Sequence, residues 1–151
     1  MRLLDLGCGP NKNNGFIGID HYAFDGVDIV RDLARGLPFE DNVIEGVLIK
    51  HCLEHFDDTD FLFIVEEMGR VCRPGAQITV ILPDATSPNI RRDPTHKKRD
   101  WDDYAFDFWK IGDDGEYVIF RGPEYGTHAK LHLARTEIDS NLDRIYILEV
   151  L

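Results

Sequence analysis

Two glycines and an aspartate near the start of the chain form the first candidate binding group. Gly7 and Gly9 follow the apolar run 3–6 in the stretch RLLDLGCGPNKNNGFIGID, and Asp20 ends the next apolar run. Glycines after a buried strand allow backbone N–H groups to approach a ligand closely. The dinucleotide fingerprint needs a third glycine where this chain has Lys12, and no G-K-[ST] sequence of a P-loop is present. The spacing therefore indicates a ligand site and leaves the ligand open.

A second group of reactive residues is HCLEH, residues 51–55, which has the H-x-x-E-H spacing of inverted zinc peptidases. That chemistry would use His51 and His55 as zinc ligands on one helical face, with Glu54 as the base. The motif follows the apolar run VLIK directly, whereas a zinc peptidase carries it within a long helix. A zinc-dependent hydrolase is therefore the less favoured hypothesis, and no metal ligand is assigned.

The composition is that of a globular chain. Its 151 residues, 43% hydrophobic and 30% charged, fit a single domain over 1–151. No apolar run approaches the roughly 20 residues of a membrane span, and no basic segment followed by an apolar one opens the chain. We therefore expect a cytoplasmic protein without a membrane partner. Cys8, Cys52 and Cys72 lack C-x-x-C spacing, which predicts free thiols.

The formal net charge of −11 argues against a nucleic-acid partner, because proteins that hold a polyanion carry a basic surface. One local exception is the basic segment 91–99 within NIRRDPTHKKRDW. This segment is either a solvated loop or a place where an anionic substrate or partner is met.

The N-terminal half shows the pattern of alternating strands and helices. Between residues 57 and 75, apolar residues recur at steps of three and four, which predicts a helix capped by Asp57 or Asp58. The sequence Arg73-Pro74-Gly75 predicts its end. The stretch RGLPFEDN predicts a turn-rich connection. Short apolar runs predict buried strands at 3–6, 16–19, 26–30, 44–50 and 76–83.

The C-terminal half has a different pattern. An aromatic stripe predicts a short amphipathic helix at 100–110 that packs in the core; its residues are Trp101, Tyr104, Ala105, Phe108 and Trp109. Runs of strand composition occur at 116–122, 128–138 and 144–151, with Ser140-Asn141 at a hairpin tip. The fold class is therefore α/β, a Rossmann-like doubly wound sheet that is mostly parallel and ends in an antiparallel hairpin.

The order of short motifs along residues 2–84 carries a family resemblance. The series resembles the class I S-adenosylmethionine-dependent methyltransferases, especially a minimal, type 11-like branch with a shortened first helix. A weaker echo occurs in DPTHK, residues 93–97. The motifs are, in order, Asp5 before LGCG, Asp20 at the second strand end, Asp32 after the third, LPFEDN, KHCLEHF, RVCRPG and LPD.

The resemblance implies S-adenosylmethionine as the cofactor and a role for several residues. Gly7, Cys8 and Gly9 would form the loop under its methionine part, with Asp5 near its amino group. Asp20 would accept hydrogen bonds from both ribose hydroxyls, which a carboxylate with two oxygens can do.

Other positions of the resemblance concern the adenine and the reacting methyl group. Asp32 would accept from the exocyclic amine of adenine, and Leu33 would contact the ring face. His51 would face the sulfonium and the nucleophile. His51 and His96 are the candidate bases, because imidazoles titrate near neutrality.

The methyl acceptor stays open, since no N-P-P-Y, D-P-P-Y or Pro-Cys signature is present. The short connection 10–15 leaves little room for a first helix, and the first strand begins almost at the first residue. An open pocket would favour a large acceptor, or a second copy or partner subunit would cover it. The alternative is a noncatalytic protein that binds the cofactor or serves as a partner subunit.

Overall fold

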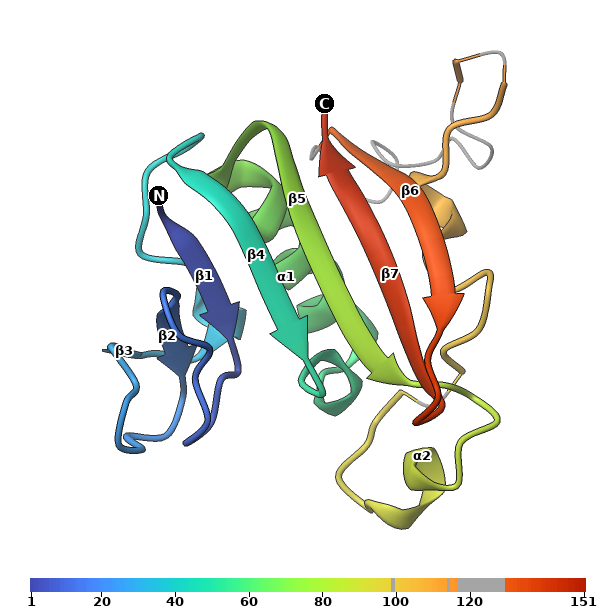
Figure 1. Ribbon diagram of the computed structural model, residues 1–151, viewed down its shortest axis with the longest axis horizontal. Coiled ribbons are helices and arrows are strands. Elements are labelled where there is room, and N and C mark those ends of the chain that lie inside the picture. The colour runs from blue at the N-terminus through green and yellow to red at the C-terminus, as the bar shows by residue number, and fades with distance from the viewer. Residues whose placement is uncertain (99, 114, 117–129) are drawn as a thin grey trace.

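The fold is described from a computed structural model, which covers residues 1–98, 100–113, 115–116 and 130–151. Within these residues the strands form a seven-stranded sheet in the order β3-β2-β1-β4-β5-β7-β6 (Figure 1). The strands are β1 (Leu3–Leu6), β2 (Ile17–Asp20), β3 (Ile29–Val30), β4 (Ile44–Lys50), β5 (Cys72–Pro83), β6 (Leu131–Ile138) and β7 (Asp143–Val150).

The pairing of the strands confirms the predicted fold class. Strands β3, β2, β1, β4 and β5 run parallel to one another, and β7 runs antiparallel to both β5 and β6. The β6–β7 hairpin turns at Ser140-Asn141, as predicted. Residues 117–122 of the predicted strand 116–122 lie outside the described residues. The parallel arrangement brings the carboxyl ends of β1, β2 and β4 to one edge of the sheet.

Helix α1 (Asp58–Val71) lies behind β4 and β5 in Figure 1 and buries an apolar face. Asp57 caps it, because its Oδ1 accepts a hydrogen bond from Asp60 N at 3.0 Å. The helix ends at Val71, two residues before the predicted stop at Arg73-Pro74-Gly75, which lies within β5. The last helical carbonyls are already used, since Val71 O accepts from Val43 N at 2.9 Å.

The connections at the cavity-forming edge of the sheet are short. Residues 7–16 join β1 to β2 through turns without a helix, as the shortened first connection predicted. Single turns of 3-10 helix follow β3 and β4, namely η1 (Leu33–Arg35) and η2 (Leu53–His55). In the described part of the chain α2 (Asn89–Arg92) and η3 (Asp107–Trp109) are equally short, and no helix there has the length and apolar character to cross a membrane.

The predicted helix at 100–110 is wrong, although its aromatic residues do enter the core. The segment forms turns and η3, with Trp101 and Trp109 buried and Tyr104 73% exposed. Contacts from β7 fix the turn, because Tyr146 Oη donates to Asp102 O at 2.6 Å. Asp102 O also accepts from Ala105 N at 3.4 Å, a bond that spans three residues as in a turn and not four as in an α-helix.

Candidate functional site

A cavity of about 430 Å³ opens at the carboxyl ends of β1, β2 and β4. Its size falls within the range of small-molecule sites. Five residues predicted from the sequence line it: Gly7, Asp20, Asp32, Leu33 and His51. The remaining lining residues are His21, Tyr22, Phe24, Arg31, Cys52, His55 and Phe56.

Gly7 lies where the ends of β1 and β4 approach each other. Its φ of +65° is in the left-handed region, and its N–H donates to Ile19 O at 2.8 Å. A Cβ at Gly7 would lie 2.8 Å from Cys52 Cβ and would overlap Cys52 Sγ. The cavity wall therefore accepts only glycine at this position.

Asp20 is held in one orientation by two backbone donors. The carboxylate is buried; Oδ2 accepts from Gly9 N and Oδ1 from Tyr22 N, both at 2.9 Å. Each carboxylate oxygen can accept a second hydrogen bond. Asp20 can therefore receive ligand donors without losing its backbone contacts.

Three predicted cofactor residues, Asp5, Cys8 and Gly9, are not among those that line the cavity. Asp5 is buried, and its Oδ2 accepts from Asn13 N at 2.8 Å and from Asn13 Nδ2 at 2.9 Å. It thereby fastens the connection after β1. Burial, followed by the charges of Asp5 and Asp20, raises the pKa of the Cys8 thiol. Contact between these three residues and a cofactor stays a prediction.

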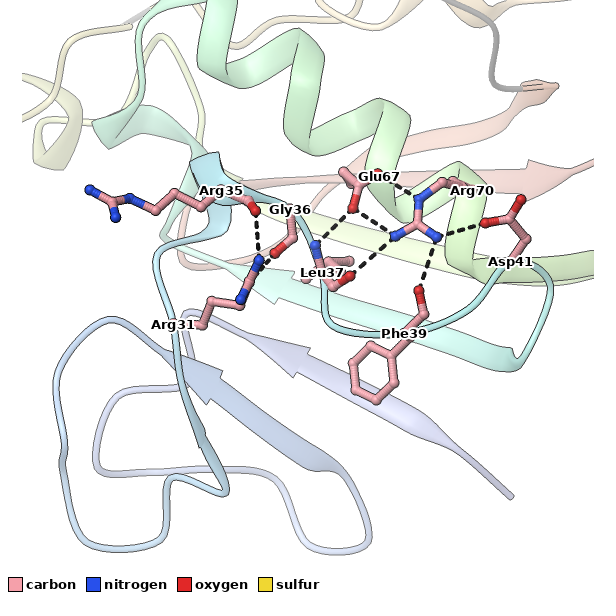
Figure 2. Close-up of polar contacts among 8 residues, drawn as sticks. All are labelled: Arg31, Arg35, Gly36, Leu37, Phe39, Asp41, Glu67 and Arg70. Atoms are coloured by element: carbon pink, nitrogen blue, oxygen red, sulfur yellow. Dashed lines mark hydrogen bonds and ion pairs between the residues drawn. The ribbon is translucent and has the colours of Figure 1, made fainter.

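Asp32 and Leu33 reach the cavity through η1. Asp32 caps this turn, since its Oδ1 accepts from Ala34 N at 3.0 Å, and Leu33 is buried. Arg31 supports the turn from the other side: its guanidinium donates to the carbonyls of Gly36 and Arg35 (Figure 2). The guanidinium of Arg31 is thus hydrogen-bonded to backbone carbonyl oxygens.

The segment that follows η1 is fastened to α1 by Arg70. Figure 2 shows its guanidinium in contact with Leu37 O (3.1 Å), Phe39 O (2.9 Å) and Asp41 Oδ1 (2.7 Å). Glu67 binds the same guanidinium and accepts from Leu37 N at 2.7 Å. The hydrogen bond from Arg70, with further help from the backbone of Leu37, lowers the pKa of Glu67. This arrangement fixes the segment after η1 relative to α1.

His51 follows the last residue of β4 directly and lines the cavity, with a φ of 49°. Its Nε2 lies 3.0 Å from Asp143 Oδ2, and its Nδ1 lies 3.5 Å from Glu54 Oε1. The hydrogen bond with Glu54 is the largest contribution to a raised pKa of His51; burial opposes it, and Asp143 adds to it. Both ring nitrogens therefore face carboxylates, and the imidazole holds its proton to higher pH than a free histidine.

His96, the other candidate base, does not line the cavity. Its ring is buried, with Nδ1 3.1 Å from Ile90 O and Nε2 3.9 Å from Glu54 Oε1. A role in proton transfer for His96 stays a prediction that this placement does not support.

The HCLEH segment does not have the geometry of a zinc peptidase. His51 has a positive φ, and η2 is a single turn of 3-10 helix over Leu53–His55. The long helix that would place His51 and His55 on one face is replaced here by a strand end and a turn. The zinc-hydrolase hypothesis therefore loses its structural basis.

Part of the basic segment is used inside the molecule. Lys98 Nζ lies 2.8 Å from Asp58 Oδ1 and 4.8 Å from the centroid of the Phe61 ring. Lys98 thus fastens its segment to α1.

The sequence analysis did not identify two aromatic side chains that line the cavity near Asp20, Tyr22 and Phe24. Tyr22 and Phe24 are 59% and 41% exposed, and their ring centroids lie 5.7 Å apart. The signal was the run HYAF directly after the second strand, where large apolar side chains stand in an otherwise polar connection. Aromatic faces beside a buried carboxylate can hold a flat or cationic ligand.

The strand order and the cavity at the strand ends are those of the class I methyltransferase fold, and comparisons with known proteins agree. Residues 18–80 match the family model of the methyltransferase domain. The chain is 28% identical over 123 residues to the ubiquinone/menaquinone biosynthesis C-methyltransferase UbiE of Vibrio campbellii, covering 82% of this chain. It spans 41% of that relative's length.

Two solved structures share the fold. A SAM-dependent methyltransferase from Archaeoglobus fulgidus is 20% identical, with a TM-score of 0.61 over 98% of this chain and 85% of that one. The complex between the Haloferax volcanii Trm112 methyltransferase activator and a candidate methyltransferase gives 14% identity and a TM-score of 0.61, over 99% and 82%. The resemblance to SAM-dependent methyltransferases is confirmed, and the matches support the predicted enzyme class and cofactor.

Proposed function

We propose that this chain transfers the methyl group of S-adenosylmethionine to an acceptor bound at the open side of the cavity. The observation that carries the proposal is the cavity at the strand ends, lined by Gly7, Asp20, Asp32 and Leu33. The last three lie within the span that matches the methyltransferase domain.

Each lining residue suits one part of this cofactor. Asp20 has oxygens that can accept the two ribose hydroxyls, while Asp32 and Leu33 offer an acceptor and an apolar contact for adenine. Gly7 contributes only backbone atoms to the cavity wall, where the methionine part would lie. The carboxylates of Asp20, Glu54 and Asp143 give this region a negative charge that attracts a cationic sulfonium.

The chemistry asked of the protein is mostly alignment. S-adenosylmethionine supplies an activated methyl group, so holding the acceptor in line with it accounts for much of the acceleration. His51 stands at the cavity as the candidate base. His51 can take a proton from the methyl acceptor only when its imidazole is neutral. Because its pKa is raised, the neutral form becomes abundant only at higher pH. We therefore expect methyl transfer to rise with pH through the neutral range for an acceptor that must lose a proton.

The test is calorimetric titration of the protein with S-adenosylmethionine and S-adenosylhomocysteine, beside Asp20→Ala and Asp25→Ala. Asp20→Ala should weaken binding by about 1–3 kcal/mol, roughly 5- to 150-fold, because it removes hydrogen bonds to a charged group. Asp25 is exposed and does not line the cavity, so its variant should bind as the parent does. Absence of heat with either ligand, or equal binding by both variants, would contradict the proposed site.

A second candidate is a noncatalytic or partner-dependent subunit with the same fold. The similarity to a chain of the Haloferax volcanii activator complex favours it. Such a protein would bind S-adenosylmethionine and produce no S-adenosylhomocysteine with a panel of large acceptors. A second copy or another subunit would then cover the open cavity, and light scattering at working concentration would report a mass above that of one chain.

A further inference from the structure

Glu54, His55 and His96 form a cluster of possible metal ligands beside the cavity. One ligand atom from each lies within 4.8 Å of the other two, and His55 also lines the cavity itself. The first two residues come from η2, and the third comes from a segment about forty residues later in the chain. Two imidazole nitrogens and one carboxylate oxygen are the donor set of open zinc sites.

The carboxylate of Glu54 is the independent sign that a ligand belongs here. Glu54 is 1% exposed, and within residues 1–98, 100–113, 115–116 and 130–151 its Oε2 has no hydrogen-bond partner. Its Oε1 lies 3.5 Å from His51 Nδ1 and 3.9 Å from His96 Nε2. A buried carboxylate oxygen without a donor is costly, and a cation beside it would remove that cost.

The contacts of His55 leave its outer nitrogen suited to a metal. Thr95 Oγ1 donates its single hydrogen to Asp93 Oδ1 at 2.6 Å and lies 3.0 Å from His55 Nδ1. The hydroxyl oxygen can therefore only accept from His55, so Nδ1 carries the proton and the lone pair is on Nε2. A chain of carboxylate, hydroxyl and imidazole of this kind orients metal-binding histidines.

His96 is oriented in the same way. Its Nδ1 lies 3.1 Å from the carbonyl oxygen of Ile90, which can only accept, so the lone pair of the neutral ring is on Nε2. The backbone holds the ring beside its neighbours, because Lys97 N and Lys98 N donate to Glu54 O at 2.8 and 3.2 Å. The segment 93–98 is therefore anchored on the same turn that carries the other two ligands.

We propose that Glu54, His55 and His96 bind one divalent transition-metal ion of the zinc class. Ligand atoms about 2.0–2.2 Å from a tetrahedral zinc stand roughly 3.3 Å apart, so atoms that now lie within 4.8 Å of one another would draw together by up to about 1.5 Å. This set differs from that of an inverted zinc peptidase, because His96 takes the place of His51 as the second imidazole.

A three-residue site leaves a fourth coordination position, and His55 brings the ion to the edge of the cavity. There the ion would hold an oxygen or nitrogen of the methyl acceptor. This role rests on the proposed function, whereas the metal site itself does not.

The experiment uses the full chain without a histidine tag, stripped with a chelator and dialysed against buffer with a small excess of Zn²⁺. We expect about one zinc per chain by elemental analysis, and with Co²⁺ as probe the visible absorption of a four- or five-coordinate site. Less than about a tenth of an equivalent, or a Co²⁺ spectrum of the aqueous ion, would overturn the proposal. Titration with S-adenosylmethionine on the same samples separates this outcome from failure of the cofactor site.

The variants identify the ligands. Glu54→Gln, His55→Asn and His96→Asn should each weaken zinc binding about tenfold or more, and Thr95→Val should weaken it through the lost support of His55. His132→Asn is the control, because it removes a histidine on β6 outside the cluster. His55→Asn and Thr95→Val alter less buried positions than Glu54, so they remain informative if Glu54→Gln fails to fold. Zinc bound with equal affinity by all variants would show that other residues hold it and would overturn the assignment.

Discussion

The two connections that lead into the cavity, residues 7–16 after β1 and residues 31–43 after β3, are held in place by different kinds of contact. In 7–16 the chain packs directly on the sheet. A Cβ at Gly18 would lie 2.5 Å from Lys12 Cδ and 2.8 Å from Cys8 Sγ, and Gly7 meets Cys52 as closely. At Gly7 and Gly18 the packing leaves no room for added atoms.

The carboxylates of Asp5 and Asp20 add hydrogen bonds to this packing, whereas residues 31–43 depend chiefly on charged side chains of α1. Arg70 on α1 binds two carbonyl oxygens and a carboxylate of this segment, and Glu67 binds the N–H of Leu37 (Figure 2). A connection without a long helix is thus held in two ways, by close packing after β1 and by hydrogen bonds from α1 after β3. The first connection is sensitive to added volume, and the second is sensitive to lost charge.

Gly7→Ala should have the largest effect of the changes considered for these connections. The new Cβ would overlap Cys52, and the left-handed φ of +65° adds its own strain, so we expect a loss of about 2–4 kcal/mol in the free energy of unfolding. Urea denaturation followed by circular dichroism measures it.

Gly9→Ala is the matched control. Gly9 has a similar φ of +55°, but among the described residues no atom lies within 4 Å of the position that a Cβ would take there. Gly9→Ala should lower the free energy of unfolding by only about 1 kcal/mol, the cost of the left-handed backbone conformation alone. Equal losses in the two variants would show that packing against Cys52 does not matter.

Arg70→Ala tests the second connection. It removes the guanidinium that donates to Leu37 O, Phe39 O and Asp41 Oδ1. We expect a loss of about 2 kcal/mol in the free energy of unfolding. Arg73→Ala is its control, because Arg73 makes one exposed ion pair with Glu45 and should cost less than about 0.5 kcal/mol. Thermal unfolding of both variants measures the difference. Similar unfolding midpoints for Arg70→Ala and Arg73→Ala would mean that Arg70 does not hold residues 31–43 in place.

The sequence predicted the first connection better than the second. The strand ends at Leu6 and Asp20 follow from buried apolar runs, and the glycines between them mark a close backbone approach. The lining of the cavity by Asp20, Asp32 and Leu33 was predicted by motif order. The hydrogen bonds of Arg70 were not, since they join positions about thirty residues apart that no local period relates.

The same limit explains the error at 100–110. The spacing of aromatic residues there is compatible with a helix, yet Trp101 and Trp109 reach the core through turns that Tyr146 and Arg144 hold from β7. Likewise, the juxtaposition of Glu54 and His96 depends on backbone bonds between distant segments. Periodicity describes one element at a time and carries no information on such contacts.

The smallest expected effect is a difference in how the two connections respond to acid. Lowering the pH should change the stability lost in Glu67→Gln and leave that lost in Gly7→Ala unchanged. The pKa of Glu67 is lowered chiefly by its hydrogen bond from Arg70, so the folded protein binds this proton more weakly than the unfolded chain, with its ordinary value of 4.5. The stabilisation is present above pH 4.5 and is lost as the pH falls through the lowered pKa. The free energy of unfolding of Glu67→Gln should therefore lie about 1 kcal/mol or less below that of the parent at pH 7, and this gap should narrow toward pH 3.

The stability lost in Gly7→Ala has a steric cause and should stay constant over the same pH range. Urea titrations at each pH, with every variant compared with the parent in the same buffer, measure both gaps. A constant deficit for Glu67→Gln would mean that the second connection, like the first, is held by packing.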